Sequence, residues 1–472
     1  MHPPIRAASL RFTHLDRARW PAAVRALVAL GFDAIDLPLV WRDYAHDDGS
    51  PDTARLDHDV RALLAVVRDA GARAVLRVGP SPVPDLHRLG LPDAILNDAA
   101  ARSHTRRRNP RWTTDGLRMV PVPSMRSERY VEAASAWVRA ACAHAGDDGV
   151  ARVIVGCGDP TVLRDAPQDP DCVGLDAATA DLAESEASAL ATFLERLATE
   201  TGVDASRVVL TIPGDPLANG AAAALAPRWA LGWAALHARA GVRAIWRGAR
   251  LATTLPAGHH VDLRAGHAPL EAPSRATDAL EVARIALAAG VRDFTLLHGC
   301  AGAGWVGAVL DDQGIARSPA ARWEALLGWA HELPDGRDVH VAVPHDRAAI
   351  LRARSEAVLG ALPISWLSRW GFDLDDVTAA PTGALAAEDA AVAHGAPWAP
   401  VLGDAGANET TTLTAHIDPP GAALVRVVEG GGARSWVLAN TGVASVNVTV
   451  GDQGRTLDAG AVAVLHEETG DA

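Results

Sequence analysis

Aspartate side chains that could act as acids or bases stand just after two predicted strands of this 472-residue chain. Asp159 follows a strand expected at 151–156, and Asp215 follows one expected at 207–213. A carboxyl group at the end of a buried strand can carry out general acid–base chemistry when its surroundings move its pKa toward the working pH. Most aspartates in loops are turn residues, so a turn role competes with catalysis at both positions.

A second group joins His259, His260 and His267 with Asp262. His260 and Asp262 alternate along one predicted strand and therefore share a face, and both residue types are metal ligands. No HExxH or facial-triad spacing accompanies them, so we expect solvated or core-satisfied histidines, no metal and no other cofactor. Asp262 is also followed two residues later by Arg264, so a structural Asp–Arg pair is an alternative to a catalytic role.

The elements that must position these side chains follow an alternating pattern. Short β-rich apolar runs and longer helical patterns succeed one another, which is typical of parallel strands joined by crossover helices. The eight strands are expected at 5–12, 33–39, 73–79, 151–156, 207–213, 243–248, 259–264 and 292–299. Helices are expected at 17–31, 57–70, 127–145, 179–201, 222–240, 275–290 and 317–332. The pattern predicts an α/β fold, a (β/α)₈ barrel, with its active site at the carboxyl ends of the strands. A doubly wound open sheet competes, but no GxGxxG follows the first strand.

Three domains are predicted along the chain. The barrel spans 1–335, and a Pro/Gly/Ala-rich linking α/β segment of unassigned organisation spans 336–410. From 411 to 472, short runs of period-two alternation separated by turn residues predict a small β-sandwich domain. We expect that domain to stabilise the barrel and to carry no site of its own.

Composition excludes several classes of protein. The charged residues give 44 − 57 = −13, and no Lys occurs, so the basic excess that a nucleic-acid partner requires is missing. No signal peptide and no run of about 20 apolar residues is present, so we expect a cytoplasmic protein without a membrane partner. The 4 cysteines show no CxxC spacing and are expected to be free thiols. An assembly of identical subunits is compatible with the sequence.

Three segments carry motifs that occur together in one enzyme family. They are LRVGPSPVPDLHRLGLP at 76–92, GFDAIDLPLVWRDYAHDDG at 31–49, and LLHGCAGAGW at 296–305 followed by LDDQG at 310–314. The first is similar to a Pro-Tyr-Ile-Cys-Ala-Glu-Trp run leading into Gly-Gly-Leu-Pro. Over about residues 1–335 the chain thereby resembles glycoside hydrolase family 35, the β-galactosidases.

The resemblance implies retaining glycoside hydrolysis, which needs two carboxylates about 5–5.5 Å apart. The nucleophile position falls on Asp262, one methylene shorter than the family's Glu. The family's Glu-Asn-Glu triplet, whose second Glu is the acid/base, falls on Gly156, Cys157 and Gly158. Asp159 is the nearest carboxylate and could serve as a relocated acid. We therefore expect normal retaining β-galactosidase activity to be weak or absent.

The resemblance also implies residues that contact a sugar at the mouth of the barrel. Asp85 stands at the sugar-contacting Glu of the strand-three motif, although it could instead cap a following helix. Trp246 and Trp305, expected at the ends of strands six and eight, could stack on a sugar face. The expected substrate-binding set is Asp85, Trp41, Arg77, His298, Trp246 and Trp305. The sequence thus predicts a β-galactosidase-like protein that acts on or binds a carbohydrate or glycoside, the alternative being a non-catalytic carbohydrate- or protein-binding pseudoenzyme.

Overall fold

A computed structural model gives the fold of the chain. It describes, apart from isolated positions, residues 4–80, 87–104, 110–114, 119–156, 176–212, 228–236, 258–264, 278–300, 307–334, 415–418, 423–430, 433–440, 444–450, 452–459 and 461–468. The predicted linking segment at 336–410 lies outside these ranges except for three two-residue strands, β11 (Arg337–Asp338), β12 (Val341–Ala342) and β13 (Trp398–Ala399). The boundaries of the three predicted domains therefore stay predictions.

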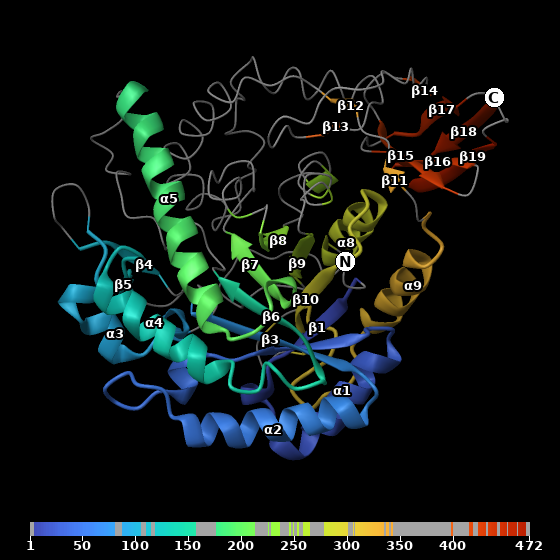
Figure 1. Ribbon diagram of the computed structural model, residues 1–472. Helices are drawn as coiled ribbons and strands as arrows, with labels where there is room; N and C mark the ends of the chain where they lie inside the picture. Colours follow the sequence, from blue (N-terminus) through green and yellow to red (C-terminus); the bar gives the residue numbers. More distant parts are fainter. Residues whose placement is uncertain are drawn as a thin grey trace.

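Eight parallel strands close into a barrel, which confirms the predicted (β/α)₈ architecture (Figure 1). Neighbouring strands follow the order β1-β10-β9-β8-β7-β6-β3-β2 around the barrel. Their bounds are β1 (Arg6–Leu10), β2 (Ala34–Pro38), β3 (Arg73–Pro80), β6 (Val150–Gly156), β7 (Val208–Ile212), β8 (Ala230–Leu236), β9 (His259–Arg264) and β10 (Phe294–Cys300). The carboxyl ends of all eight strands therefore lie at one rim, the mouth of the barrel.

The sixth strand of the barrel lies elsewhere than the sequence predicted. β8 covers ALGWAAL at 230–236, which was expected inside a helix, whereas Ile245 and Trp246 of the expected strand at 243–248 are helical. Ala and Leu favour helices intrinsically, but a strand buried on both faces of a parallel barrel needs only a short, continuous apolar run. The apolar run at 230–236 forms the strand, and the prediction was wrong because it relied on helix propensity.

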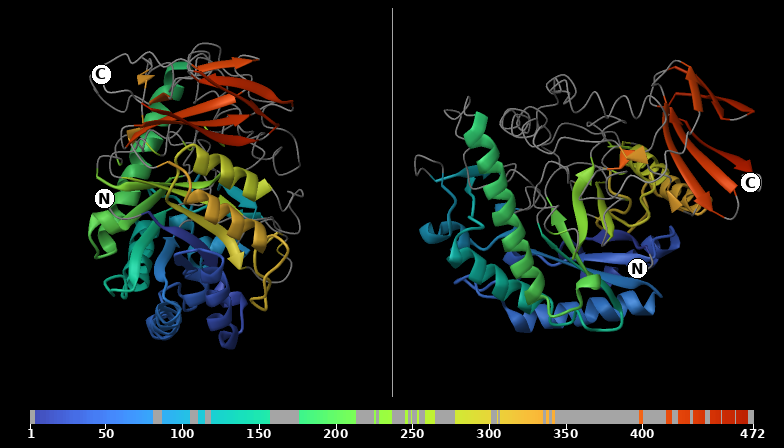
Figure 2. Two further views of the ribbon diagram at one scale, coloured as in Figure 1. Left: turned by 90° about the vertical axis from the view of Figure 1, so that its right-hand side faces the viewer. Right: turned by 45° about the horizontal axis from the view of Figure 1, so that its top comes forward.

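Two antiparallel sheets follow the barrel, beside α8 (Asp278–Ala288) (Figures 1 and 2). One sheet has the order β11-β15-β16-β19, with β15 (Ala423–Gly430), β16 (Ala433–Asn440) and β19 (Val462–Glu468). The other has the order β14-β17-β18, with β14 (Ala415–Asp418), β17 (Val446–Val450) and β18 (Gln453–Leu457). Trp436 and Leu438 of the first sheet share an apolar core with Val446 and Val448 of the second, as in a β-sandwich.

The outer face of the first sheet packs on the barrel. Val437 and Ala439 of β16 belong to the same apolar core as the barrel helices. Beside them, the buried Arg426 of β15 lies against Gly290, just after the carboxyl end of α8. A guanidinium is favourable there because the end of a helix carries partial negative charge.

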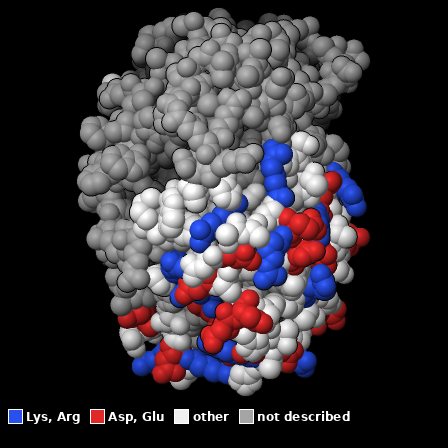
Figure 3. Space-filling model, turned by 90° about the vertical axis from the view of Figure 1, so that its left-hand side faces the viewer, with Lys and Arg blue, Asp and Glu red and all other residues white. Residues whose placement is uncertain are grey.

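Helices surround the described part of the barrel. Besides α8 they are α1 (Trp20–Ala29), α2 (Thr53–Asp69), α3 (Asp93–Asn97), α4 (Glu128–Ala141), α5 (Asp176–Glu200) and α9 (Ala320–Ala330). Ion pairs Arg139–Glu200 and Arg196–Glu128 join α4 to α5, at 2.8 and 2.9 Å. Basic and acidic side chains alternate over the described part of that side of the molecule, without a field of single sign (Figure 3).

Short elements complete the loops at the mouth. They are the 3₁₀ turns η1 (Phe12–His14), η2 (Arg17–Arg19), η3 (Trp41–Tyr44), η4 (His87–Gly90) and η5 (Ala99–Ala101), and the hairpin of β4 (Trp112–Thr114) and β5 (Met119–Pro121). At the opposite end of the barrel, η7 (Ala205–Arg207) leads into β7.

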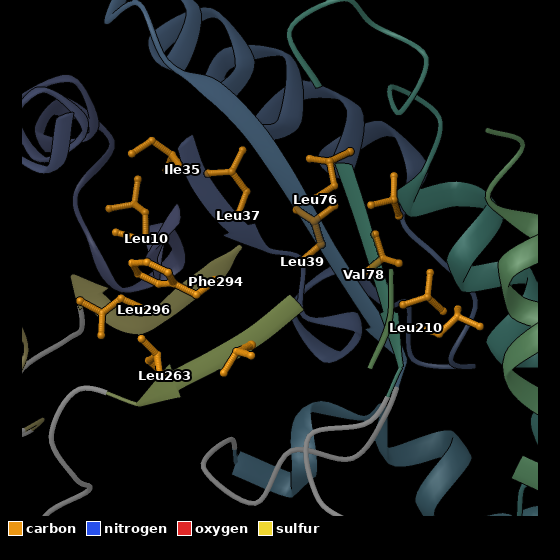
Figure 4. Packing of buried hydrophobic residues seen from close by; sticks show 14 of the residues in the cluster. Leu10, Ile35, Leu37, Leu39, Leu76, Val78, Leu210, Leu263, Phe294 and Leu296 are labelled. Atoms are coloured by element: carbon orange, nitrogen blue, oxygen red, sulfur yellow. The ribbon is translucent and has the colours of Figure 1, made fainter. Parts of the chain in front are cut away.

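The main apolar core lies between the strands and the helices (Figure 4). Ile35 and Leu37 of β2, Leu76 of β3 and Leu263 of β9 belong to it. Because side chains alternate across a strand, the residues between these positions point into the barrel. A second, small cluster of Ile5, Ala7, Ala34, Val75, Ile154 and Val209 fills part of that interior. Other inward positions hold charged residues, among them Asp36, Arg77, Arg152 and Asp262.

Candidate functional site

Strand alternation places charged side chains inside the barrel. In β2 (AIDLP), Asp36 stands between the outward-facing Ile35 and Leu37, and in β3 Arg77 follows the outward-facing Leu76. A charge buried without a partner costs several kcal/mol or more, so each of these groups requires an opposite charge nearby. The barrel interior supplies it.

Arg77 binds two carboxylates at once, Asp36 on the neighbouring β2 and Asp262 on β9 across the barrel. Its Nε donates to both oxygens of Asp36 at 3.1 and 3.2 Å. Its Nη1 and Nη2 donate to the two oxygens of Asp262 at 2.9 and 2.7 Å, which is a bidentate pair. The side chain of Arg77 is 18% exposed, against 0% for Asp36 and 3% for Asp262. We call Asp36, Arg77 and Asp262 the Arg77 cluster.

The electrostatics of the Arg77 cluster differ between its two carboxyl groups. Burial raises the pKa of Asp36 above its ordinary value, although Arg77 and a hydrogen bond with Ser9 oppose the rise. Burial acts in the same direction on Asp262, but Arg77 and His260 outweigh it and hold that pKa below its ordinary value. Asp262 is therefore an ionised carboxylate whose charge is already neutralised by a guanidinium.

A second cluster extends from Asp262 toward the amino ends of the strands. Nε2 of His260 lies 3.3 Å from Oδ1 of Asp262, and Nδ1 of His260 lies 2.5 Å from Oδ1 of Asp293. Asp293 also accepts a hydrogen bond from Arg152 of β6 and one of 3.4 Å from the backbone N–H of Ile5. We call His260, Asp293 and Arg152 the His260 cluster; all three are buried.

The two clusters occupy the acid–base groups inside the described barrel. A retaining nucleophile needs an unencumbered oxygen directed at the anomeric carbon, with a second carboxyl group about 5–5.5 Å away. Both oxygens of Asp262 instead accept from Arg77, and Asp262 lies within β9 rather than beyond its end. This is the geometry of an ion pair, and Arg77 is its most exposed member.

The end of the fourth barrel strand is shaped by Gly156, which matches the first Glu of the family triplet. Its φ is +138°, and a Cβ there would lie 2.4 Å from the backbone oxygen of Thr211 on β7. Real Cβ atoms do not approach an oxygen so closely, so β6 and β7 meet at a distance that only glycine permits. Cys157, Gly158 and Asp159 lie outside the described residues.

Two of the predicted sugar-binding tryptophans lie in the packed interior. Trp41 is buried, its ring is stacked on that of Trp137 of α4 at 6.0 Å, and its Nε1 donates to the backbone oxygen of Gly49 at 3.1 Å. Trp246 is buried in a helical segment and does not end a strand, because the sixth strand is β8. The expectation that Trp246 ends the sixth strand was therefore wrong.

His298 and Trp305 do come together near the carboxyl end of β10. Their ring centroids are 3.6 Å apart with an interplanar angle of 27°, and Arg11, directly after β1, lies over the Trp305 ring at 5.7 Å. His298 has a φ of +61°, a conformation that a non-glycine residue adopts only when its surroundings enforce it. These three residues make an aromatic and cationic wall at the β10–β1 side of the mouth.

The remaining predicted site residues cannot be placed. Asp85 and the alternative acid Asp215 lie, like Asp159, outside the described residues, as does the side chain of Arg264. Asp262 does pair with an arginine, but the partner is Arg77 of β3. The pair with Arg264 that the sequence offered as an alternative stays a prediction.

Sequence reasoning missed three members of the two clusters, Asp36, Arg152 and Asp293, and it missed the ion-pairing role of His260. Asp36 and Arg152 were visible as single charges inside apolar strand patterns, AIDLP and VARVIVG. A charge at an inward position of a buried strand is a signal of an interior ion pair. Asp293 precedes β10, and no periodicity distinguishes it from a turn residue.

The described residues also bear on metal binding and on membrane insertion. Within them, no group of three or more His, Cys, Asp or Glu side chains has the arrangement of a metal site. In the same part of the chain, no helix is long and apolar enough to cross a membrane. Cys142 and Cys300 are buried free thiols, as expected for those two positions.

Comparison with known proteins finds similarity at the level of fold. No family model and no curated protein matches the chain. Solved structures of glycoside hydrolases do match. A cold-adapted β-galactosidase from Rahnella sp. R3 is 11% identical with a TM-score of 0.62, covering 99% of this chain and 98% of that one. A catalytic mutant of a GH42 β-galactosidase from G. stearothermophilus is 10% identical with a TM-score of 0.61, covering 98% of each chain. A GH5_18 protein from Streptomyces cattleya, in complex with GlcNAc, is 14% identical with a TM-score of 0.50, covering 77% and 92%.

Proposed function

We propose that this chain is a β-galactosidase-like barrel protein, related to glycoside hydrolase family 35, that binds a glycoside at the mouth of its barrel. We propose further that its standard retaining hydrolysis is weak or absent. The observation that carries the proposal is the bidentate pair between Asp262 and Arg77, at 2.7 and 2.9 Å. A carboxylate that gives both oxygens to a guanidinium is a poor nucleophile because its charge is already stabilised.

Two further observations support a glycoside as the ligand. The sequence motifs at 31–49, 76–92 and 296–305 resemble those of β-galactosidases, and β-galactosidases share the fold over nearly the whole chain. The S. cattleya relative of the fold was solved with GlcNAc bound. At the mouth, the wall of His298, Trp305 and Arg11 offers ring faces and a cation of the kind that pack against sugars.

The first test measures binding and turnover on the same preparation. Calorimetric titration with galactosides, glucosides and N-acetylglucosaminides is expected to detect binding of at least one of them. Hydrolysis of the matching aryl glycosides is expected to be absent or reduced, since loss of a general acid costs about 10²–10⁴-fold in rate. No binding to any member of a broad glycan panel would refute the binding proposal. Turnover at the ordinary rate of a β-galactosidase would refute the loss of hydrolysis.

A matched pair of variants separates a binding protein from an enzyme with a rearranged site. Asp262→Asn and Asp36→Asn each remove one charged partner of the same guanidinium. In a binding protein, both variants are expected to alter ligand affinity to a similar extent. In a hydrolase that uses Asp262 as nucleophile and Asp159 as relocated acid, Asp262→Asn and Asp159→Asn would abolish turnover, whereas Asp36→Asn would spare a substantial part of it. Circular dichroism on each variant confirms that it is folded before it is scored.

A further inference from the structure

In the part of the chain that the structure describes, His260 is the one side chain that contacts both a carboxylate of the Arg77 cluster and a carboxylate of the His260 cluster. Its Nε2 lies 3.3 Å from Asp262 and its Nδ1 lies 2.5 Å from Asp293. A neutral imidazole has only one N–H, so its other nitrogen would present a lone pair to a carboxylate oxygen. An imidazolium has a proton on each nitrogen, so it can donate to Asp293 and attract Asp262 at 3.3 Å, where the contact is an ion pair without hydrogen-bond geometry. The contacts on the two sides of the ring therefore favour the charged form.

With all three carboxyl groups ionised, the charges of the two clusters balance only when this ring is protonated. Asp36, Asp262 and Asp293 contribute three negative charges, and Arg77 and Arg152 contribute two positive charges. Protonated His260 brings the sum to zero, while the neutral form leaves one uncompensated negative charge among buried groups. An uncompensated buried charge is strongly destabilising.

Among the described residues, the other neighbours of His260 do not supply a replacement cation. On β8 its register partner is Gly232, which carries no charge. On its own strand, burial holds the pKa of His259 down to about 4, so that ring is neutral. On β10 the inward residue after Asp293 is the uncharged Thr295, and on β1 Ile5 offers only a backbone N–H to Asp293. Arg292 donates to the backbone oxygens of Leu287, Val291 and Pro334.

We propose that His260 is held as an imidazolium and that release of its proton at alkaline pH is a switch that loosens the barrel where β9, β10 and β6 are joined. Loss of the proton from His260 also affects Arg77, because Asp262 shares its oxygens between His260 and Arg77. Arg77 is the partly exposed member of the two clusters.

The direction of the pH dependence follows from linkage. Burial lowers the pKa of His260, but Asp262 and Asp293 outweigh it, and the pKa in the folded protein lies above the ordinary 6.5. The contribution to stability is complete below pH 6.5, where folded and unfolded chains both bind the proton. Above 6.5 only the folded chain retains it, so the unfolding equilibrium constant rises by about tenfold per pH unit until the folded pKa is passed.

The pKa values of two carboxyl groups, Asp293 and Asp262, are shifted in the opposite direction, so their contributions to stability are lost at acid pH. The pKa of Asp293 is lowered to about 2: burial opposes the shift, and His260 and Arg152 overcome it. Asp262 is lowered for the same kind of reason. Their contributions are complete above the ordinary pKa of about 4 and are lost only in stronger acid. The raised pKa of Asp36 acts in the same direction as that of His260, and Asp36 is retained in both histidine variants compared below.

The experiment is denaturant unfolding of the full chain from pH 5 to pH 9, compared among the wild type, His260→Gln and His46→Gln. His46 is an exposed histidine outside both clusters, so its variant controls for loss of an imidazole. The wild type and His46→Gln are expected to lose stability by about tenfold per pH unit above neutrality, whereas His260→Gln is expected to be less stable at pH 6 and to lack that loss. An alkaline loss of equal slope in His260→Gln would overturn the proposal.

A second measurement applies even where His260→Gln fails to fold. Nitrogen-15 NMR of the histidine rings in the wild type distinguishes a doubly protonated ring from either neutral tautomer. One ring is expected to remain doubly protonated at pH 7.5, and to become neutral earlier in Asp293→Asn, where one carboxylate has been removed. If all 18 histidines are neutral at pH 7.5, the proposal fails.

Discussion

Adjacent histidines on β9 have different charge states, one cationic and one neutral, because they face opposite sides of the strand. His260 points into the barrel between Asp262 and Asp293 and is cationic. His259 points outward with Val261 and Leu263, its Nε2 is buried, and burial lowers its pKa to about 4. Two histidines at neighbouring positions of one strand thus differ in charge because one points into the barrel and the other points outward.

At the residue scale, the sequence identified Asp262 but not the side chain that pairs with it. Strand periodicity identifies a neighbour at two residues' distance, such as Arg264, and says nothing about a residue 185 positions away across the barrel. Arg77 was recognised only through its motif. The ion pair depends on closure of the barrel, so local pattern alone could not predict it.

Gly156 provides a residue-scale prediction. Gly156→Ala is expected to destabilise the protein by about 2–4 kcal/mol, since the new Cβ would meet backbone of β7 at 2.4 Å and the φ of +138° is unfavourable for alanine. Denaturant unfolding measures the change in the free energy of unfolding.

Gly328→Ala is the matched control for that substitution. Gly328 lies in α9 with nothing within 4 Å of its would-be Cβ, so alanine there is expected to stabilise by about 0.5–1 kcal/mol. Equal effects of the two substitutions would show that the close approach of β6 and β7 is not a constraint.

At the scale of elements, seven of the eight barrel strands were placed correctly, and the exception has a physical reason. Strands such as RAVLRVGP contain β-branched residues and carry a charge at an inward position, and both features separate them from helices. β8 has neither: ALGWAAL contains no β-branched residue and no charge. Its identity as a strand comes from its neighbours β7 and β9, with which it pairs in parallel. Along the C-terminal sheets the sequence pattern missed β18, whose QGRTL is polar and exposed up to Leu457.

The junction of α8 with the first C-terminal sheet yields an element-scale prediction. Gly290 follows α8 with a φ of +109°, and its would-be Cβ lies 3.0 Å from the guanidinium of Arg426. Gly290→Ala is expected to cost about 2–4 kcal/mol, partly from backbone strain and partly from displacement of Arg426. Denaturant unfolding measures the effect, and near-ultraviolet circular dichroism, to which Trp436 in the core of the two sheets contributes, reports any change in aromatic packing.

A second glycine isolates the backbone part of that cost. Gly71 follows α2 with a φ of +75° and has nothing within 4 Å of its would-be Cβ. Gly71→Ala is expected to cost about 1–2 kcal/mol from strain alone. If Gly290→Ala costs no more than Gly71→Ala, Arg426 is not held tightly against the end of α8.

At the scale of the whole molecule, the barrel has an interior unlike that of an apolar (β/α)₈ core. Small residues such as Ala7, Ala34 and Gly232 line inward positions, and the long side chains of Arg77 and Arg152 occupy the space with their carboxylate partners. A buried network of this kind adds little net stability compared with apolar packing, but every member becomes costly to remove. The closed barrel could be predicted from the succession of elements, whereas the charged interior follows from which residues meet once the barrel closes.

The ion pairs across the barrel also join residues that are synthesised at different times. Arg77 and Arg152 are synthesised before Asp262 and Asp293, to which they are joined over 185 and 141 residues of sequence. A nascent chain that has released only its first half therefore carries two guanidiniums at inward positions whose carboxylates, apart from Asp36, have not yet been made. Early strands gain little by closing on one another under those conditions, so assembly of the barrel waits for β9 and β10.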